Sequence, residues 1–545
     1  MVRIHDIRTI MYINSINIKT IQYFFLALFA FSINYYFSNK GLYPIDTFSF
    51  FDTSYLITQG YHPIKDFWVI SGVFVDYLQA LFFLIFGSNW NAYIIHSSFL
   101  NAFISMFFFF FLNNFNKNSL INFILGISLA TLCYPVAGTP FPYQHSYIFS
   151  LISIMVFFLA VKKDDQRYWK ILPFFMFISF LSMQMPAGII NFLLLAFITI
   201  YFFKFKKDFL LSFVLGSVFC LLILFFYFFF LKVNLKDAFI QLFLFPLSIG
   251  EGRITGATDA YPSANLFSKL TLRGVIGHFK FIHFFILANF VGLILYLKKN
   301  LNNFYSKKII LNIFLLLCSI SFIFHQLITA NQTYIFSLIP FLCGFFIIQL
   351  NDFFNINSKK INIILLVLII FTTIKYHNIY NVKRKFMDLQ EVNLKNSLQA
   401  NYLNKRFNNL KWITPFYFKK NPQEELDLLK ESISLISKEN SKEIILITHY
   451  QFFSILIQKR INIANRWYFP DNNTFPSSKN NKYFFHYVKK FNKKIEEEGI
   501  KKIYLVQSYP EEFKFINFKI LLGNDCFREK KINKILSLII LNSCN

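Results

Sequence analysis

Long apolar runs separated by short polar segments fill the first 376 residues of the chain. A helix needs about 20 predominantly apolar residues to cross the roughly 30 Å hydrocarbon core of a bilayer. Eleven runs reach or approach that length, and we expect each to form a membrane-spanning helix: 21 to 38, 92 to 112, 120 to 136, 146 to 161, 171 to 184, 187 to 203, 209 to 231, 279 to 297, 309 to 326, 333 to 350 and 361 to 376. The pattern predicts a polytopic α-helical membrane protein.

A twelfth apolar run, from 73 to 86, is short and carries Asp76 and Gln79. If it lies along the membrane interface, Lys and Arg gather in one set of alternate loops. The short loops of the other set (137 to 145, 185 to 186 and 327 to 332) then contain no Lys or Arg. Because cytoplasmic loops carry the excess of basic residues, we expect a cytoplasmic amino terminus and an interfacial amphipathic helix at 73 to 86.

The pattern changes near residue 378, where charges become frequent and apolar residues come in short blocks. The blocks 443 to 450 and 502 to 507 predict buried strands, each preceded by a Lys/Glu-rich helical segment, at 422 to 438 and 482 to 498. Alternating helix and strand indicates a small α/β domain. We therefore expect two parts: a transmembrane part over 1–377, with its first outer loop at 39–91, and a periplasmic α/β domain over 378–545.

Composition supports the membrane assignment, because 55% of the residues are hydrophobic. The formal net charge of +27 is assigned to loop lysines that set topology, so no nucleic-acid partner is expected. The six cysteines show no metal-binding spacing. The expected location is the inner membrane of a bacterium, crossed many times.

Acidic residues gather in the first outer loop of a chain in which only 15% of residues are charged. They are Asp46, Asp52, Asp66 and Asp76. A carboxylate cluster at one membrane face of such a chain is a candidate functional site.

The order of residues in this loop resembles the GT-C superfamily of membrane glycosyltransferases, including the protein mannosyltransferases and aminoarabinose transferases. The landmarks are Asp46 soon after the first helix, then Gly60, Pro63, Asp66-Phe67-Trp68 and Gly87. The resemblance covers about residues 20 to 160. It implies about eleven spans of GT-C type, juxtamembrane helices in the first outer loop and a polyprenyl-phosphate-linked sugar donor. The second acid that often follows the first in that family is absent, since residue 47 is Thr.

Attack of a sugar hydroxyl on an anomeric carbon needs a carboxylate to take the proton, best placed in a partly desolvated cleft that raises its pKa. We choose Asp46 for that base, with Asp66 and Asp52 as further catalytic candidates. The alternative is that Asp46 caps the helix starting at Thr47 and that the other two acids are solvated.

Two further loops supply binding candidates. In several GT-C enzymes the loop between helices three and four adds an acid, but here Gln144 and His145 stand in that place, so no metal ligand is assigned and a divalent metal stays an open alternative. The long loop from about 232 to 278 offers Arg253, Lys269 and Arg273, and the leaving phosphate of the donor requires such cations.

The expected function is transfer of a sugar, with inversion, from a polyprenyl phosphate to an envelope glycan, lipid or protein. A transporter or flippase would place ionisable residues mid-membrane, where the spans hold only His96, His283 and His325. A lipid-linked-glycan polymerase or ligase, and an inactive scaffold, stay as alternatives.

Overall fold

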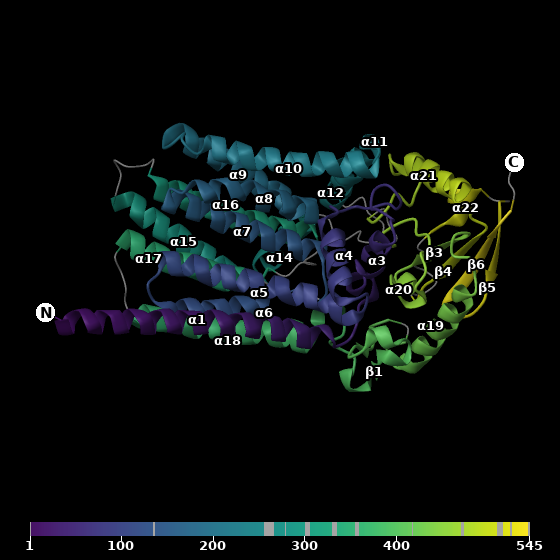
Figure 1. Ribbon diagram of the computed structural model, residues 1–545, viewed down its shortest axis with the longest axis horizontal. Coiled ribbons are helices and arrows are strands. Elements are labelled where there is room, and N and C mark those ends of the chain that lie inside the picture. The colour runs from purple at the N-terminus through teal and green to yellow at the C-terminus, as the bar shows by residue number, and fades with distance from the viewer. Residues whose placement is uncertain are drawn as a thin grey trace.

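The computed structural model describes residues 2–134, 137–255, 266–277, 279–299, 306–329, 335–354, 359–416, 418–469, 473–508, 516–523 and 526–542. Side chains are described from Ile18 onward, except that of residue 267. A bundle of long helices runs along the longest axis, and an α/β region covers one end of the bundle (Figure 1).

Each of the eleven expected spans coincides with a helix: α1 (Val2–Ser38), α5 (Trp90–Phe115), α6 (Ser119–Cys133), α7 (Pro142–Lys163), α8 (Gln166–Ser182), α9 (Gln184–Lys204), α10 (Leu210–Leu231), α15 (Lys280–Lys299), α16 (Lys307–Ile328), α17 (Leu338–Phe354) and α18 (Lys359–His377). Within the described residues, eight helices are long and apolar enough to cross a membrane. The other three, α6, α8 and α17, have 15, 17 and 17 residues. The chain is thus a helical protein of multi-pass membrane type.

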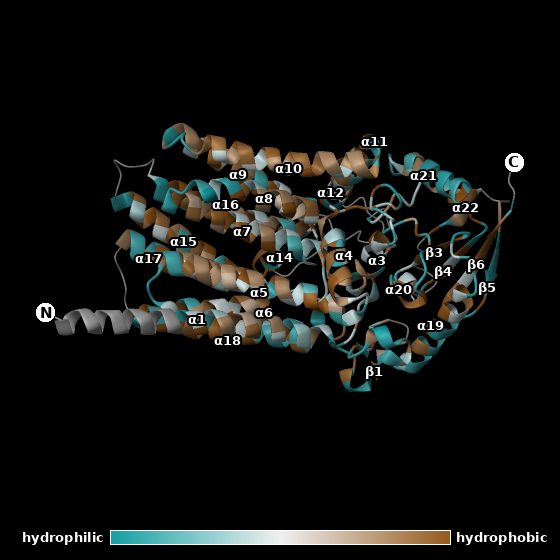
Figure 2. Ribbon diagram, in the orientation of Figure 1, coloured by the Kyte–Doolittle hydropathy of each residue, from teal (hydrophilic) through white to brown (hydrophobic). Residues whose placement is uncertain are grey.

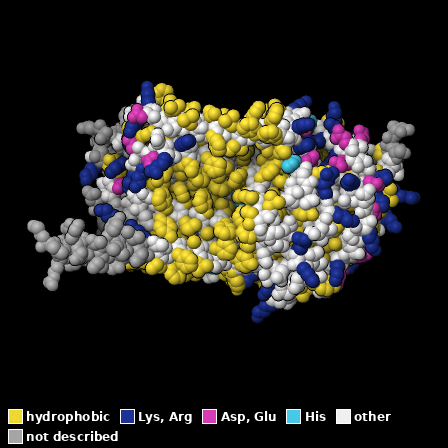
Figure 3. Space-filling model, viewed as in Figure 1, with side chains coloured by type: hydrophobic (Ala, Val, Ile, Leu, Met, Phe, Trp, Pro, Cys, Tyr) yellow, Lys and Arg dark blue, Asp and Glu magenta, His cyan; other side chains and the backbone are white. Residues whose placement is uncertain are grey.

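The apolar helices differ widely in how much of their surface is buried within the protein. The apolar window of α7 is entirely buried, whereas only 11% of the corresponding window of α10 is buried. Because α10 is also the most apolar of the eight, its exposed side chains suit contact with lipid rather than water. The bundle carries apolar residues along its helices (Figure 2), and its visible surface shows a hydrophobic band between two charged ends (Figure 3).

Short helices fill the loops at the end of the bundle that meets the α/β region: α2 (Pro44–Thr47), α3 (Phe51–Thr58), α4 (Phe74–Phe86), α11 (Leu235–Phe239), the π-helix η1 (Ile240–Leu244), α12 (Phe245–Thr255), α13 (Leu266–Lys269) and α14 (Leu272–Ile276). The run expected at the interface is α4, whose 13 residues rise only about 20 Å. It lies at the junction between the bundle and the α/β region (Figure 1).

The α/β region confirms both predicted strands and both predicted helices. Its elements after α18 are η4 (Asn378–Val382), η5 (Lys385–Met387), η6 (Leu394–Asn396), β1 (Leu398–Gln399), η7 (Ala400–Tyr402), η8 (Lys405–Phe407), β2 (Lys411–Trp412), α19 (Pro422–Ser437), β3 (Ile444–Thr448), α20 (Phe453–Ile457), α21 (Phe484–Glu497), β4 (Lys502–Val506), α22 (Phe518–Leu522), β5 (Phe527–Lys531) and β6 (Leu536–Leu541). The main sheet has the order β3-β4-β6-β5, with β3 and β4 parallel and the other two pairs antiparallel. Strands β5 and β6 were not predicted.

A buried ion pair joins the first long loop to the α/β region. The guanidinium of Arg466 lies 2.5 Å from the carboxylate of Asp76 on α4, and the two side chains are 1% and 0% exposed. Arg466 also donates to the Ser71 hydroxyl and to the Gly72 carbonyl. Asp76 accepts a further hydrogen bond, of 2.9 Å, from Thr53. Asp76 is therefore a structural anchor at the junction, outside any span.

Candidate active site

Asp46 lies on the one-turn helix α2, directly after α1. Pro44 opens this helix, and the Thr47 hydroxyl accepts a 3.0 Å hydrogen bond from the Tyr43 amide, which closes the turn. The Asp46 side chain is partly exposed. Burial, and next the charge of Asp388, raise the pKa of Asp46 to about 7. A carboxylate with that pKa can accept a proton near neutral pH.

Asp388, the second acid, was missed from the sequence. It follows η5 in a left-handed conformation, with φ of +53°, which Asp tolerates better than most residues. Its neighbours Met387 and Leu389 are buried in a small cluster with Ala137, and Tyr43 packs against that cluster. The segment after α18 is thereby fixed beside the loop that carries Asp46. Burial also raises the pKa of Asp388, and when Asp388 is ionised its charge disfavours ionisation of Asp46.

The loop between α6 and α7 is held in place through the backbone of Gly138. Its carbonyl accepts hydrogen bonds from Asn34, Ser38 and Ser97, the first on α1 at 3.3 Å. Gly138 has a φ of +76°, and a Cβ there would lie 2.6 Å from the Cα of Ser38. Only glycine therefore fits this close approach to α1.

The two candidates in this loop, Gln144 and His145, are 1% and 0% exposed. Gln144 donates to the carbonyl of Cys133. One ring nitrogen of His145 lies 2.8 Å from the Phe141 carbonyl, and the other lies 3.1 Å from Nε2 of His96. The structure thus shows both side chains holding the start of α7 in place, and their predicted contact with substrate stays a prediction.

Two of the three predicted phosphate-binding cations come together. Lys269 donates a 2.9 Å hydrogen bond to the Leu327 carbonyl. Burial, and next the nearby charge of Arg253, lower the pKa of Lys269. Arg253 also acts electrostatically on His325. Arg273 is exposed on α14, and within the described residues no hydrogen bond or ion pair joins its side chain to Arg253 or Lys269.

Arg253 lines a hollow of about 50 Å³, together with Ile70, Tyr143, Met183, Gln184, Met185, Pro246, Ile249, Gly250, His325, Ile328, Thr329 and Asn473. Within the described residues, Gln184 Oε1 and His325 Nε2 are buried here without a hydrogen-bond partner. Buried polar atoms are normally paired, so these two are suited to a polar ligand. Tyr143, which lines the hollow, belongs to the same apolar cluster as Ile45, the residue before Asp46.

Asp52 lies elsewhere in the loop and holds the α/β region. Its carboxylate accepts the amides of Ser454 and Ile455, at 3.0 and 2.9 Å, in the first turn of α20. Burial, opposed by these amides, raises the pKa of Asp52 to about 7. The side chain is 0% exposed. These hydrogen bonds explain why Asp52 is buried here, and its catalytic role stays a prediction.

Replacing Asp52 with Ala should therefore destabilise the junction by about 2 to 4 kcal/mol, because two buried amides lose a charged acceptor. The expected result is a lower temperature of unfolding and faster proteolysis of the α/β region. The matched control is Glu496→Ala, which removes an exposed carboxylate of α21 and should change stability by less than about 0.5 kcal/mol. Equal effects of the two changes would contradict the anchoring role.

Asp66, the remaining candidate, closes its own turn. One of its carboxylate oxygens accepts the His62 amide at 2.7 Å, and its carbonyl accepts the Lys494 ammonium. It lines a polar cavity of about 310 Å³ with α21. The cavity that Asp66 lines also holds Asp237, Glu497 and Glu498. The four acids predicted from the sequence thus have four different surroundings, and Asp46 is the one whose pKa Asp388 raises.

The described residues contain no group of three or more His, Cys, Asp or Glu side chains placed to hold a metal ion. No protein-family model matches the chain, and no curated protein is detectably similar to it.

Proposed function

We propose that the chain is a membrane glycosyltransferase that moves a sugar from a polyprenyl phosphate to an envelope acceptor, with inversion at the anomeric carbon. The observation that carries the proposal is the Asp46 carboxylate, at the end of the bundle where the loops meet the α/β region. Burial, and next the charge of Asp388, raise its pKa to about 7. A general base works best when its pKa lies near the working pH.

The proposed step uses Asp46 as the base. Its carboxylate takes the proton of an acceptor hydroxyl while the hydroxyl oxygen forms a bond to the anomeric carbon. The bond from that carbon to the phosphate oxygen breaks on the opposite face, and its electron pair leaves with the polyprenyl phosphate. Arg253 and Lys269 are the cations proposed to stabilise the phosphate as its charge develops.

The proposal also includes a periplasmic location for the α/β region, an enzyme of GT-C type and eleven crossings of the membrane. Cys526, in the α/β region, is disulfide-bonded. Disulfides persist mainly in oxidising compartments such as the bacterial periplasm, so this bond supports the placement of the α/β region, and of Asp46 beside it, outside the cytoplasm. The lipid carrier of the donor would then reach the site from the outer leaflet.

A transfer assay tests the proposal. The purified protein, in lipid vesicles with an envelope extract as acceptor, is given a labelled polyprenyl-phosphate sugar or, as a control, the matching nucleotide sugar. We expect transfer only from the lipid donor, release of polyprenyl phosphate and an inverted anomeric configuration by NMR. No consumption of lipid donors would overturn the proposal, and donor crossing the bilayer with its sugar still attached would favour a flippase.

The carboxylate pair also predicts a pH dependence. Asp46 acts only when deprotonated, so turnover should rise with pH through about 7. Asp388→Asn removes a negative charge that raises the pKa of Asp46, so the rise should move to lower pH, by about half a unit for a partly screened pair. The matched control is Glu391→Gln, an exposed acid on the same segment. If the pH profile of turnover does not move in Asp388→Asn, the proposed effect of Asp388 on the pKa of Asp46 is contradicted.

A further inference from the structure

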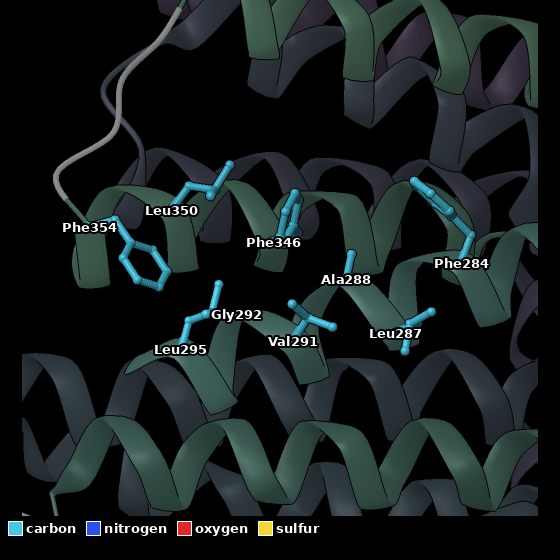
Figure 4. Close-up of a pocket in the computed structure, with 9 residues that line it drawn as sticks. All are labelled: Phe284, Leu287, Ala288, Val291, Gly292, Leu295, Phe346, Leu350 and Phe354. Carbon is cyan, nitrogen blue, oxygen red and sulfur yellow. The ribbon is translucent and has the colours of Figure 1, made fainter. Parts of the chain in front are cut away.

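An apolar groove of about 380 Å³ lies between α15 and α17. Its walls are side chains of two neighbouring helices that face a common gap (Figure 4): Phe284, Leu287, Ala288, Val291, Gly292, Leu295, Phe346, Leu350 and Phe354. None of these residues carries a polar side chain. Gly292 lets α15 approach α17 closely, because a Cβ there would lie 2.2 Å from Oε1 of Gln349.

The groove is open on a side of the bundle that suits lipid. Only 28% of the apolar window of α15 is buried. Four lining side chains of this helix, Phe284, Leu287, Val291 and Leu295, are 44 to 58% exposed. From Phe284 to Leu295 the helix rises about 16 Å, which is about half of the roughly 30 Å hydrocarbon core and so the depth of one leaflet.

Two lysines mark one end of this groove. Lys280 Nζ and Lys375 Nζ lie 5.4 and 5.3 Å from the centre of the same ring, that of Phe281. Phe281 precedes Phe284 by three residues and Ala288 by seven, so it continues the helix face that lines the groove. The two ammonium groups are near enough to act on each other electrostatically. An anion between them would relieve that repulsion.

We propose that an anionic phospholipid of the surrounding bilayer binds here, with one acyl chain along the groove and its phosphate between Lys280 and Lys375. The acyl chain contributes to the binding free energy through the apolar area that it buries. The two lysines supply positive charge at the depth of the lipid headgroup. The groove opens toward the bilayer, and neither lysine lines the hollow of Arg253. The site is therefore independent of the proposed transfer reaction.

Native mass spectrometry of the full chain in mild detergent tests this site, with phosphatidylglycerol, phosphatidylethanolamine or polyprenyl phosphate added at matched concentrations. We expect phosphatidylglycerol to bind at least fivefold more tightly than phosphatidylethanolamine. Because each lysine near the surface contributes about fivefold, K280Q/K375Q should weaken phosphatidylglycerol binding by about 30-fold. A288W should also weaken binding, since the indole would occupy the groove while the charge stays unchanged.

The matched control is K298Q/K299Q, which removes the same charge from the other end of α15, where both lysines are exposed. It should leave phosphatidylglycerol binding within about twofold, and all variants should keep the wild-type temperature of unfolding. Equal losses in the two lysine pairs, or no loss in A288W, would overturn the site. Tighter binding of polyprenyl phosphate than of phosphatidylglycerol would overturn the assignment to a bilayer phospholipid.

Discussion

Replacing Asp46 with Asn is expected to lower turnover by about 10²- to 10⁴-fold, the usual contribution of a positioned general base. Asn has nearly the same shape but cannot take the acceptor proton. Because the side chain is partly exposed and lies on a one-turn helix, the change should leave folding and donor binding intact. The measurements are single-turnover transfer from a labelled polyprenyl-phosphate sugar and, separately, donor affinity.

The comparison variant is Asp66→Asn, which changes the other partly exposed acid of the same loop. The Asp66 carboxylate bonds its own turn, so turnover should fall by less than about tenfold. Transfer unchanged by Asp46→Asn would remove Asp46 as the base. A loss of donor binding equal to the loss of turnover would make it a binding residue instead.

Replacing Arg466 with Met is expected to destabilise the junction by about 3 to 5 kcal/mol. The change leaves the carboxylate of Asp76 buried without its partner, and removing one member of a buried ion pair costs about that much. It also removes the donors to Ser71 and Gly72. The measurement is the unfolding of the α/β region in detergent, followed by tryptophan fluorescence and limited proteolysis.

Two further variants separate this effect from a general loss of charge. The double change Asp76→Leu/Arg466→Met should recover at least about 1 kcal/mol, because an apolar pair avoids the cost of an unpaired buried charge. Lys501→Met breaks an exposed pair with Glu443 and should cost at most about 1 kcal/mol. A double variant less stable than Arg466→Met alone would contradict the ion-pair explanation.

The elements that the sequence predicted well are those with a clear local pattern. Apolar runs identified every long helix, and the blocks at β3 and β4 stood out because those strands are buried on both faces. Strand β5 was missed because Phe527–Lys531 is polar and four of its five residues are exposed. Its partner β6 was recognised as apolar but not as a strand, since only the antiparallel pairing with β4 and β5 defines it.

The candidate site was only half predictable. Asp46 was found because it follows the first helix in an acid-rich loop. Asp388 has no recognisable motif around it. It lies near Asp46 because the chain after α18 runs beside the first loop, where Met387 and Leu389 pack in a buried cluster. The Asp76–Arg466 pair depends in the same way on packing between distant segments, which local spacing does not encode.

The backbone that leaves α1 has consequences for synthesis. The amides of Gly41 and Leu42 donate to the carbonyls of Lys411 and Ile413, at 3.1 and 2.9 Å. These partners emerge from the ribosome some 370 residues later, when every apolar helix of the bundle has already been made. The first loop therefore completes its fold last, and a chain released before residue 388 would insert its helices yet leave Asp46 without its neighbouring acid.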